Sequence, residues 1–234
     1  MRMRRMKNLA PRMAAVEAYR IPDAKAMKGT WRSLMPQARE LRVEVGCGKG
    51  KFTVETAQQN PDILFIAIER VQEAMVIGME SAQKMGLKNV WFVDMDVAGI
   101  TECFEDSEVD LLYINFCDPW PRSKNAKRRL TYRAFLELYR VILKDGGEIH
   151  FKTDNAGLFP FSLDEFRLCN MELREVTDDL HANGPVGVMT GYEEKFYALG
   201  TPIHRCVAVS TKAGKPSDEV LYPKKKKAEA EPEA

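Results

Sequence analysis

Two short segments of the chain hold most of the residues that could do chemistry. The first reads Val43-Glu44-Val45-Gly46-Cys47-Gly48-Lys49-Gly50, where glycines let the backbone approach a ligand closely and adopt positive φ angles. The second reads Asn115-Phe116-Cys117-Asp118-Pro119-Trp120-Pro121, where two prolines, each fixing φ at roughly −65°, stiffen the loop that carries an acid. The first segment predicts a loop for an adenosine-containing cofactor. Asp118 in the second is a candidate catalytic acid or substrate binder, with a turn aspartate as the structural alternative.

The glycine loop is not a complete dinucleotide fingerprint. The fingerprint GxGxxG requires a third glycine at the position where this chain has Lys51. Glu44, two residues before the first glycine, would repel a pyrophosphate but could pair with the ammonium group of an amino acid. These two features favour S-adenosylmethionine over a dinucleotide, with Gly46 and Gly48 binding the cofactor. A purely structural glycine turn and a nicotinamide-dependent oxidoreductase are the alternatives.

Further acids follow the next two apolar runs. Glu69 ends the second run, where a carboxylate can accept both ribose hydroxyls of an adenosine in charge-assisted hydrogen bonds worth roughly 1.5–3 kcal/mol each. Asp94 and Asp96 follow the third run, and either could accept the adenine amino group. The residues alone do not separate these two, and a surface glutamate at a strand end is the alternative for Glu69.

The net charge of +1 conceals two segments that are purely basic. Residues 1–12 and residues 122–133 contain lysines and arginines but no acid. A balanced total charge with basic segments suits a polyanion that touches one face of the protein. The second segment follows Asp118 directly, so we expect it to bind phosphates. A solvated basic surface is the alternative.

Cysteines, histidines and apolar runs limit the remaining classes of protein. The five cysteines are odd in number and form no CxxC pair, which predicts neither a zinc site nor a disulfide framework and favours the reducing cytoplasm. His150, His181 and His204 lack ligand spacing, so no metal is predicted. No apolar run approaches the roughly 20 residues that span a bilayer, and the basic start lacks the apolar stretch of a secretory signal.

Apolar runs alternate with helical patterns at the spacing of βαβ units. This alternation predicts an α/β fold with a doubly wound, mostly parallel sheet whose strand C-termini share one edge, where ligands bind. Two more strands at 172–177 and 204–210 would make seven. We expect a basic arm with a lead-in helix at 1–40, one domain at 41–211 and a disordered Lys/Glu-rich tail at 212–234. The other expected elements are strands at 42–45, 62–68, 89–93, 109–115 and 148–152, and helices at 51–58, 73–85 and 131–143, the last ended by Asp145-Gly146-Gly147.

Six motifs along the chain are specific in combination. They are Glu44-Val-Gly-Cys-Gly-Lys-Gly50, Ile68-Glu69, Asp118-Pro-Trp-Pro121, Lys127-Arg-Arg-Leu-Thr-Tyr132, His150-Phe-Lys-Thr-Asp-Asn155 and Thr190-Gly-Tyr-Glu-Glu-Lys-Phe196. Together they resemble the bacterial tRNA (guanine-N7)-methyltransferases over residues 1–210. The resemblance implies a class I, Rossmann-like methyltransferase fold with an antiparallel last strand. It also implies methyl transfer from S-adenosylmethionine to N7 of a guanine in tRNA, in the variable loop.

The resemblance further implies roles for individual residues. S-adenosylmethionine would be bound by Glu44, Glu69, Asp96 and Asp118. This set chooses Asp96 over Asp94 and makes Asp118 the catalytic residue. The tRNA would be contacted by Arg122, Asp154, Thr190, Gly191, Tyr192 and Glu193. Independently of the resemblance, the basic residues Lys127, Arg128 and Arg129 are predicted to bind the phosphates of the tRNA. For Thr190 and Glu193, the capping box of a helix is the structural alternative.

The chain departs from this family at the start of its second basic segment. Arg122 stands where the family usually has lysine, which preserves the charge but not the geometry. Ser123-Lys124-Asn125 stands where the family has a basic pair with histidine, which argues against a His-dependent proton step. The short spacing and the Met-Arg-Met-Arg start resemble the shorter branch of the family, which forms homodimers. A tRNA-binding module without catalysis and a methyltransferase for another RNA or a small molecule are the alternative functions.

Overall fold

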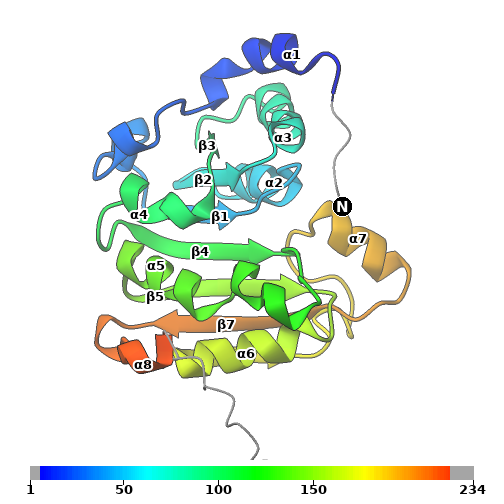
Figure 1. Cartoon of the computed structure of the whole chain (residues 1–234). Helices are drawn as coiled ribbons and strands as arrows, with labels where there is room; N and C mark the ends of the chain where they lie inside the picture. Colours follow the sequence, from blue (N-terminus) through cyan, green and yellow to red (C-terminus); the bar gives the residue numbers. More distant parts are fainter. Residues whose placement is uncertain (1–5, 222–234) are drawn as a thin grey trace, which may run out of the picture.

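A sheet of seven strands forms the scaffold of the protein (Figure 1). The computed structural model describes residues 6–221. The strands are β1 (Glu40–Val45), β2 (Ile63–Glu69), β3 (Val90–Asp94), β4 (Val109–Asn115), β5 (Leu143–Thr153), β6 (Glu172–Thr177) and β7 (His204–Ser210). Their order is β3-β2-β1-β4-β5-β7-β6, in which β1 to β5 pair in parallel and β7 is antiparallel to both of its neighbours. The predicted doubly wound α/β sheet with an antiparallel last strand is confirmed.

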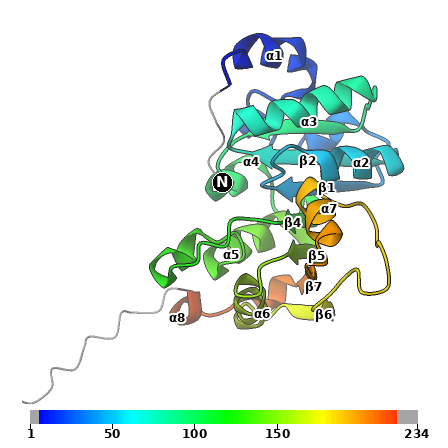
Figure 2. The same cartoon turned by 90° about the vertical axis from the view of Figure 1, so that its right-hand side faces the viewer.

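Helices cover both faces of this sheet, as Figure 2 shows. They are α1 (Leu9–Ala15), α2 (Lys51–Gln59), α3 (Gln72–Lys84), α4 (Ile100–Cys103), α5 (Arg133–Ile142), α6 (Leu158–Leu168), α7 (Gly191–Ala198) and α8 (Asp218–Leu221). Helices α1 to α3 pack into one core and α4 to α6 into the other. Helix α7 lies beside the C-terminal ends of β4 and β5 in both views. Within residues 6–221, no helix is both long and apolar enough to cross a membrane.

Strand β2 illustrates how the sheet becomes a rigid platform. Alternate residues of the run 63–68 enter the two cores, because successive strand side chains point to opposite faces. All of them are at most 1% exposed, and burying each of the larger ones stabilises the fold by about 1.5–3 kcal/mol. Glu69, the next residue, is therefore held firmly at the edge of the sheet.

The start of β5 differs from the prediction. The sequence predicts a helix up to Leu143 and a strand only from Glu148, but β5 already begins at Leu143. Residues 144–147 form an irregularity inside the strand, where the register with β4 shifts. Gly146 adopts a φ of 75° there, which glycine accepts without a Cβ clash. The Asp-Gly-Gly signal therefore marks a bulge within a strand and not a connecting loop.

The start of the predicted disordered tail also needs correction. Residues 212–221 pack against the domain: Leu221 is 4% exposed, and Arg133 Nη1 donates a hydrogen bond to the Val220 carbonyl oxygen at 2.8 Å. Apolar Leu221 gives this stretch a side chain to bury. The rest of the predicted tail and residues 1–5 of the basic arm lie outside the described residues.

Candidate cofactor and substrate site

The glycine loop between β1 and α2 leaves its backbone open at Gly48. The φ of Gly48 is 56°, and a Cβ added there would meet no atom within 4 Å. Gly50 has a different task, because its Cβ would lie 2.9 Å from the Cα of Gly78 in α3. Only glycine lets α2 and α3 approach this closely. The loop thus combines an accessible turn with a tightly packed helix start.

The Glu69 carboxylate ties this loop to the end of β2. Its Oε2 accepts a hydrogen bond from the Gly48 N–H at 2.9 Å, and its Oε1 accepts from the Arg70 and Val71 N–H groups at 2.8 and 2.9 Å. A carboxylate oxygen has two lone pairs, so Oε2 can accept a further donor such as a ribose hydroxyl. The ribose role of Glu69 stays a prediction. Its second task, fixing the glycine loop, was not predicted from the sequence.

Glu44 belongs to a buried polar cluster just before the loop. It is 3% exposed, and its carboxylate accepts hydrogen bonds from Asn115 Nδ2 at 2.9 Å and from the Thr53 hydroxyl. Burial raises the pKa of Glu44, although these hydrogen bonds and the Lys152 ammonium oppose the shift. Asn115 Oδ1 is also buried and has no hydrogen-bond partner among the described residues. A buried acceptor that lacks a donor, next to a buried carboxylate, fits the cationic amino group of an amino-acid-containing cofactor.

We expect Glu44→Gln to stabilise the ligand-free protein. Because burial raises the folded-state pKa of Glu44, its ionised form costs folding free energy above that pKa, and the cost fades as the pH falls through it. Glutamine keeps the shape and both hydrogen-bond partners, so the melting temperature should rise by about 2–4 °C, the shift that about 1 kcal/mol produces at this chain length. Calorimetry over a pH series checks this. A variant that melts below the wild type in mildly alkaline buffer would contradict the prediction.

Asp94 and Asp96 at the end of β3 have different surroundings. Asp94 accepts a hydrogen bond from the Gln72 side chain, whereas exposed Asp96 accepts one from a nearby backbone N–H at 2.9 Å and lies 3.7 Å from Arg70. Asp94 pairs in register with Glu69, so these two acids lie at the same edge of the sheet as the glycine loop. The Asp96 carboxylate is 61% exposed, which leaves it accessible to an adenine amino group.

The loop after β4 is held in a strained shape around Asp118. Phe116 and Trp120 have positive φ angles of 51° and 41°, which cost non-glycine residues about 1–3 kcal/mol each. Arg129 holds the loop by donating hydrogen bonds from Nε to the Pro119 carbonyl oxygen at 2.9 Å and from Nη2 to that of Trp120 at 3.0 Å. Asp118 itself is exposed, and no side chain within residues 6–221 hydrogen-bonds to its carboxylate. The loop thus presents a free acid in a fixed place.

Cys117, next to this acid, is not poised to act as a nucleophile. Burial raises the pKa of the Cys117 thiol to about 12, with the Asp118 charge as the second cause. Burial also raises the pKa of Cys47 in the glycine loop. Both thiols are therefore protonated at neutral pH, whereas the thiolate is the reactive form. The reactive group that the site offers is the carboxylate.

The basic segment after Asp118 divides into free and engaged residues. Its exposed members include Arg122, Lys124, Lys127 and Arg128. Arg129 is half-buried, because it donates to the loop carbonyls and lies 4.1 Å from the centre of the Phe161 ring. In the N-terminal arm, Arg12 pairs with Glu80 of α3 at 2.6 Å. Among the described cations of the two basic segments, those exposed to phosphates are therefore Lys7 and the ones at 122–128, of which Arg128 also lies 5.0 Å from the centre of the Trp120 ring.

Helix α7 carries the last of the predicted substrate residues. Thr190 Oγ1 accepts a hydrogen bond from the Glu193 N–H at 3.0 Å, and Glu193 Oε2 accepts one from the Thr190 N–H at 3.1 Å, which is a complete capping box. Tyr192 is 56% exposed, whereas Glu193 is fully buried. Asp154 is half-buried directly after β5. The fold brings the start of α7 to the same edge as Asp154 and Asp118 but turns the Glu193 carboxylate inward.

Two residues that were not predicted to belong to the site surround Glu193. Lys152 Nζ donates a hydrogen bond to Glu193 Oε2 at 2.6 Å, and His181 Nε2 lies 2.9 Å from Glu193 Oε1. His181 Nδ1 accepts a hydrogen bond from the Val186 N–H at 3.2 Å, so a neutral His181 carries its proton on Nε2 and donates to Glu193. Burial lowers the pKa of Lys152, and Glu193 opposes this shift.

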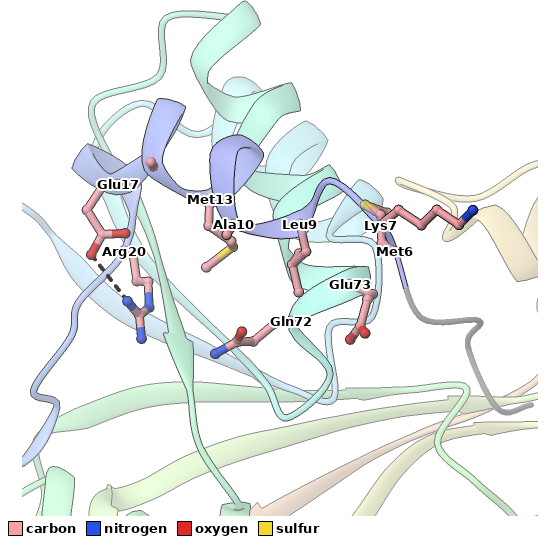
Figure 3. A pocket seen from close by; sticks show the side chains of 10 residues that line it. Met6, Lys7, Leu9, Ala10, Met13, Glu17, Arg20, Gln72 and Glu73 are labelled. Carbon is pink, nitrogen blue, oxygen red and sulfur yellow. Dashed lines mark hydrogen bonds and ion pairs between the residues drawn. The ribbon is translucent and has the colours of Figure 1, made fainter.

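A cavity of about 1090 Å³ lies between α1 and the start of α3 (Figure 3). Its walls include Met6, Leu9, Met13, Gln72 and Glu73. The Glu17 and Arg20 side chains form an ion pair of 3.2 Å on its wall. None of the predicted cofactor residues lines this cavity, although α3 begins shortly after Glu69.

Solved structures with this fold include several methyltransferases. The antibiotic-resistance methyltransferase Kmr aligns with a TM-score of 0.57 at 18% identity, over 82% of this chain and 94% of that chain. The 16S rRNA methyltransferase KamB gives a TM-score of 0.58 at 15% identity, over 77% and 92%. A family model described as "Putative methyltransferase" matches residues 38–206. This fold, with its glycine loop and strand-end acids, defines a class I, S-adenosylmethionine-dependent methyltransferase.

Relatives at higher identity narrow this class to one family. The tRNA (guanine-N(7)-)-methyltransferase of Geobacillus kaustophilus (strain HTA426) is 43% identical over 210 residues, which are 89% of this chain and 97% of the relative. The protein of the same name from Streptococcus suis (strain 05ZYH33) is 42% identical over 209 residues, 89% of this chain and 99% of the relative. The chain belongs to the tRNA (guanine-N7)-methyltransferase family.

Proposed function

We propose that this protein transfers the methyl group of S-adenosylmethionine to N7 of a guanine in the variable loop of tRNA. The observation that carries the proposal is the exposed Asp118 carboxylate on its rigid loop. Strand β4 is the direct neighbour of β1, so the Asp118 loop and the glycine loop leave the sheet from adjacent strands. The exposed cations at 122–128 follow on the other side of Asp118. This order supports a donor site, an acid and a phosphate surface that adjoin one another.

The acceptors at the sheet edge suit three parts of the cofactor. Glu69 would accept from the ribose hydroxyls and Asp96 from the adenine amino group, while Glu44 and Asn115 Oδ1 would face the amino-acid ammonium. The turn at Gly48 leaves room for a ligand to approach the backbone. S-adenosylmethionine, when bound, supplies a methyl group that its sulfonium centre has already activated.

Asp118 would hold the guanine during the transfer. Guanine N7 has a free lone pair in the neutral base, so the site needs no strong general base. Asp118 can accept hydrogen bonds from the guanine N1–H and N2–H groups, and its negative charge offsets the positive charge that grows on the ring. Such positioning can account for on the order of 7–11 kcal/mol of the barrier.

The target guanine must come from an accessible part of the RNA. N7 lies on the major-groove edge of the base, and this groove is deep and narrow in A-form RNA. The enzyme therefore needs a loop base or must pull a base from its stack. The exposed ring of Tyr192 on α7 offers a stacking surface, and Arg122 and Asp154 offer polar contacts nearby. These features support a loop such as the variable loop as the target.

The affinity for tRNA should fall steeply with salt, because each phosphate contact releases counterions. Lys127→Ala and Arg128→Ala remove exposed cations, so each should weaken the dependence of log K on log salt by about 1. Filter binding over a potassium chloride series measures this slope. Lys88→Ala is the matched control, since Lys88 is exposed just before β3, at the opposite edge of the sheet. A flat salt response, or an equal loss of slope in the control, would contradict a phosphate surface at 122–128.

The whole proposal is tested by mapping modified nucleosides in tRNA from cells that lack this protein. We expect N7-methylguanosine to disappear from the variable loop and to return when the wild-type gene is restored, but not with an Asp118→Ala gene. Unchanged tRNA would refute the proposal, and a loss of methylation in another RNA would point to the alternative substrate. The cytoplasmic setting and the homodimer stay predictions, which localisation of a tagged protein and sedimentation analysis would test.

A further inference from the structure

Two contacts attach helix α7 to the end of β5 and to the Asp118 loop. At the end of β5, Lys152 forms a 2.6 Å ion pair with Glu193. In the Asp118 loop, the Phe116 ring stacks on Phe196 of α7, with ring centroids 6.3 Å apart. Both figures place α7 beside the strand ends from which these partners come. The helix is therefore attached to the strand next to the acid and to the loop of the acid itself.

Lys152 connects these contacts to the cofactor side of the site. Its carbonyl oxygen accepts a hydrogen bond from the Phe116 N–H at 2.9 Å, and its Nζ lies 5.0 Å from the centre of the Phe52 ring in α2. Its register partner on β4 is Asn115, which donates to Glu44. A single residue thus touches α7, the start of the catalytic loop and the helix behind the glycine loop.

Glu193 is closed off from a substrate in this arrangement. Its side chain has no exposed surface, and the Lys152 side chain is 9% exposed. One carboxylate oxygen accepts from Lys152 and from the Thr190 N–H, and the other accepts from His181. A buried ion pair with satisfied hydrogen bonds is weak evidence for stability, but removing one partner leaves an uncompensated buried charge. The pair adds little stability but is costly to break, which suits a role of Glu193 in fixing the position of α7.

We propose that Glu193 is a positioning residue of the methyl transfer and not a tRNA contact: through Lys152 it holds α7 against Phe116 and so keeps Asp118 in place. If α7 moves away, Phe116 loses its stacking partner and its strained backbone can relax, which shifts the acid two residues later. A misplacement of about 1 Å can lower a rate by about 100-fold. The effect on rate rests on the proposed function, whereas the coupling of α7 to the loop does not.

The test compares breaking the buried pair with removing it. Lys152→Met leaves the Glu193 charge without its lysine. Lys152→Met with Glu193→Gln removes both charges and keeps the His181 hydrogen bond and the half of the cap in which Thr190 Oγ1 accepts from the backbone N–H of residue 193. In single-turnover assays with saturating tRNA and labelled donor, we expect the rate to fall by about 100-fold in the single variant and to recover by about tenfold or more in the double variant. The Kd for tRNA should stay within about threefold of the wild type in both.

Hydrogen exchange supplies a readout that does not depend on activity. The 116–122 peptide of full-length protein, and the Phe116 amide in particular, should exchange faster in Lys152→Met and near the wild-type rate in the double variant. Phe196→Ala should have the same effect while leaving the ion pair intact, and Phe196→Leu should restore slow exchange. Glu194→Gln is the matched control on the same helix, because its exposed pair with Lys51 contributes little.

Two results would overturn the inference. One is a loss of tRNA affinity in the double variant, which lacks the Glu193 carboxylate, when Lys152→Met, which keeps it, binds tRNA like the wild type, since that pattern marks a direct contact. The other is unchanged exchange of residues 116–122 in both Lys152→Met and Phe196→Ala. Wild-type protein that leaves tRNA guanine unmethylated would instead refute the proposed function, and the exchange data would still decide the positioning role.

Discussion

Asp118→Ala is expected to lower turnover by about 100- to 1000-fold, the loss typical when a preorganised electrostatic group is removed from a transition state. The exposed Asp118 carboxylate has no side-chain partner within residues 6–221, so its charge is available to a bound ligand. Cofactor affinity should fall far less, because Glu44, Glu69 and Asp96 stay in place. Single-turnover methylation of a tRNA transcript and equilibrium binding of the donor separate the two quantities. Equal turnover in variant and wild type would refute the assignment.

Two further variants sharpen this experiment. Asp118→Asn keeps the size of the side chain and one acceptor oxygen, so a loss close to that of alanine would identify the negative charge as the active feature. Asp164→Ala removes an exposed acid of α6, outside the Asp118 loop, and should leave turnover unchanged. A similar loss in Asp164→Ala would mean that the assay reports general damage.

Glu69→Ala is expected to weaken donor binding by about 100-fold or more, because it removes two charge-assisted hydrogen bonds of at least about 1.5 kcal/mol each. The same change frees the Gly48 N–H and loosens the glycine loop. Isothermal titration with S-adenosylmethionine and with its demethylated product measures the loss. Both ligands contain the ribose, so both affinities should fall together.

The contribution of the loop can be separated from that of the ribose. Glu69→Gln retains an oxygen that accepts from the Arg70 and Val71 N–H groups but offers no second acceptor to Gly48. Its donor affinity should therefore lie between those of the wild type and the alanine variant. Wild-type affinity in Glu69→Ala would contradict both roles of this carboxylate.

The sheet and its ligand edge could be predicted because their signals are local. An apolar run bounded by turn residues specifies a strand, and the predicted strand 109–115 coincides with β4. Right-handed crossovers then bring the strand ends to one edge, so Glu44, Glu69 and Asp118 could be grouped without coordinates. The capping box at Thr190 was predicted for the same reason, since its two partners are three residues apart.

The support of the site could not be predicted, because it consists of contacts between distant segments. Lys152 and Glu193 are 41 positions apart, and nothing in either local motif indicates that they pair. His181 shows no ligand spacing, yet the fold places it against the same carboxylate. At 145–147, two adjacent glycines indicate a turn, and only the pairing with β4 turns that signal into a bulge.

Arg129 shows that basic residues within one short run are not interchangeable. Two of its nitrogens donate hydrogen bonds to the carbonyl oxygens of Pro119 and Trp120. The single ammonium of a lysine cannot reproduce this forked geometry. Exchange between lysine and arginine is thus tolerable at position 127 but restricted at 129. Arg128 has a loop contact of its own, because its guanidinium lies 5.0 Å from the centre of the Trp120 ring. When such runs are compared between species, the number of positive charges overstates the affinity for nucleic acid. Some of the basic side chains stabilise the catalytic loop and do not bind phosphate.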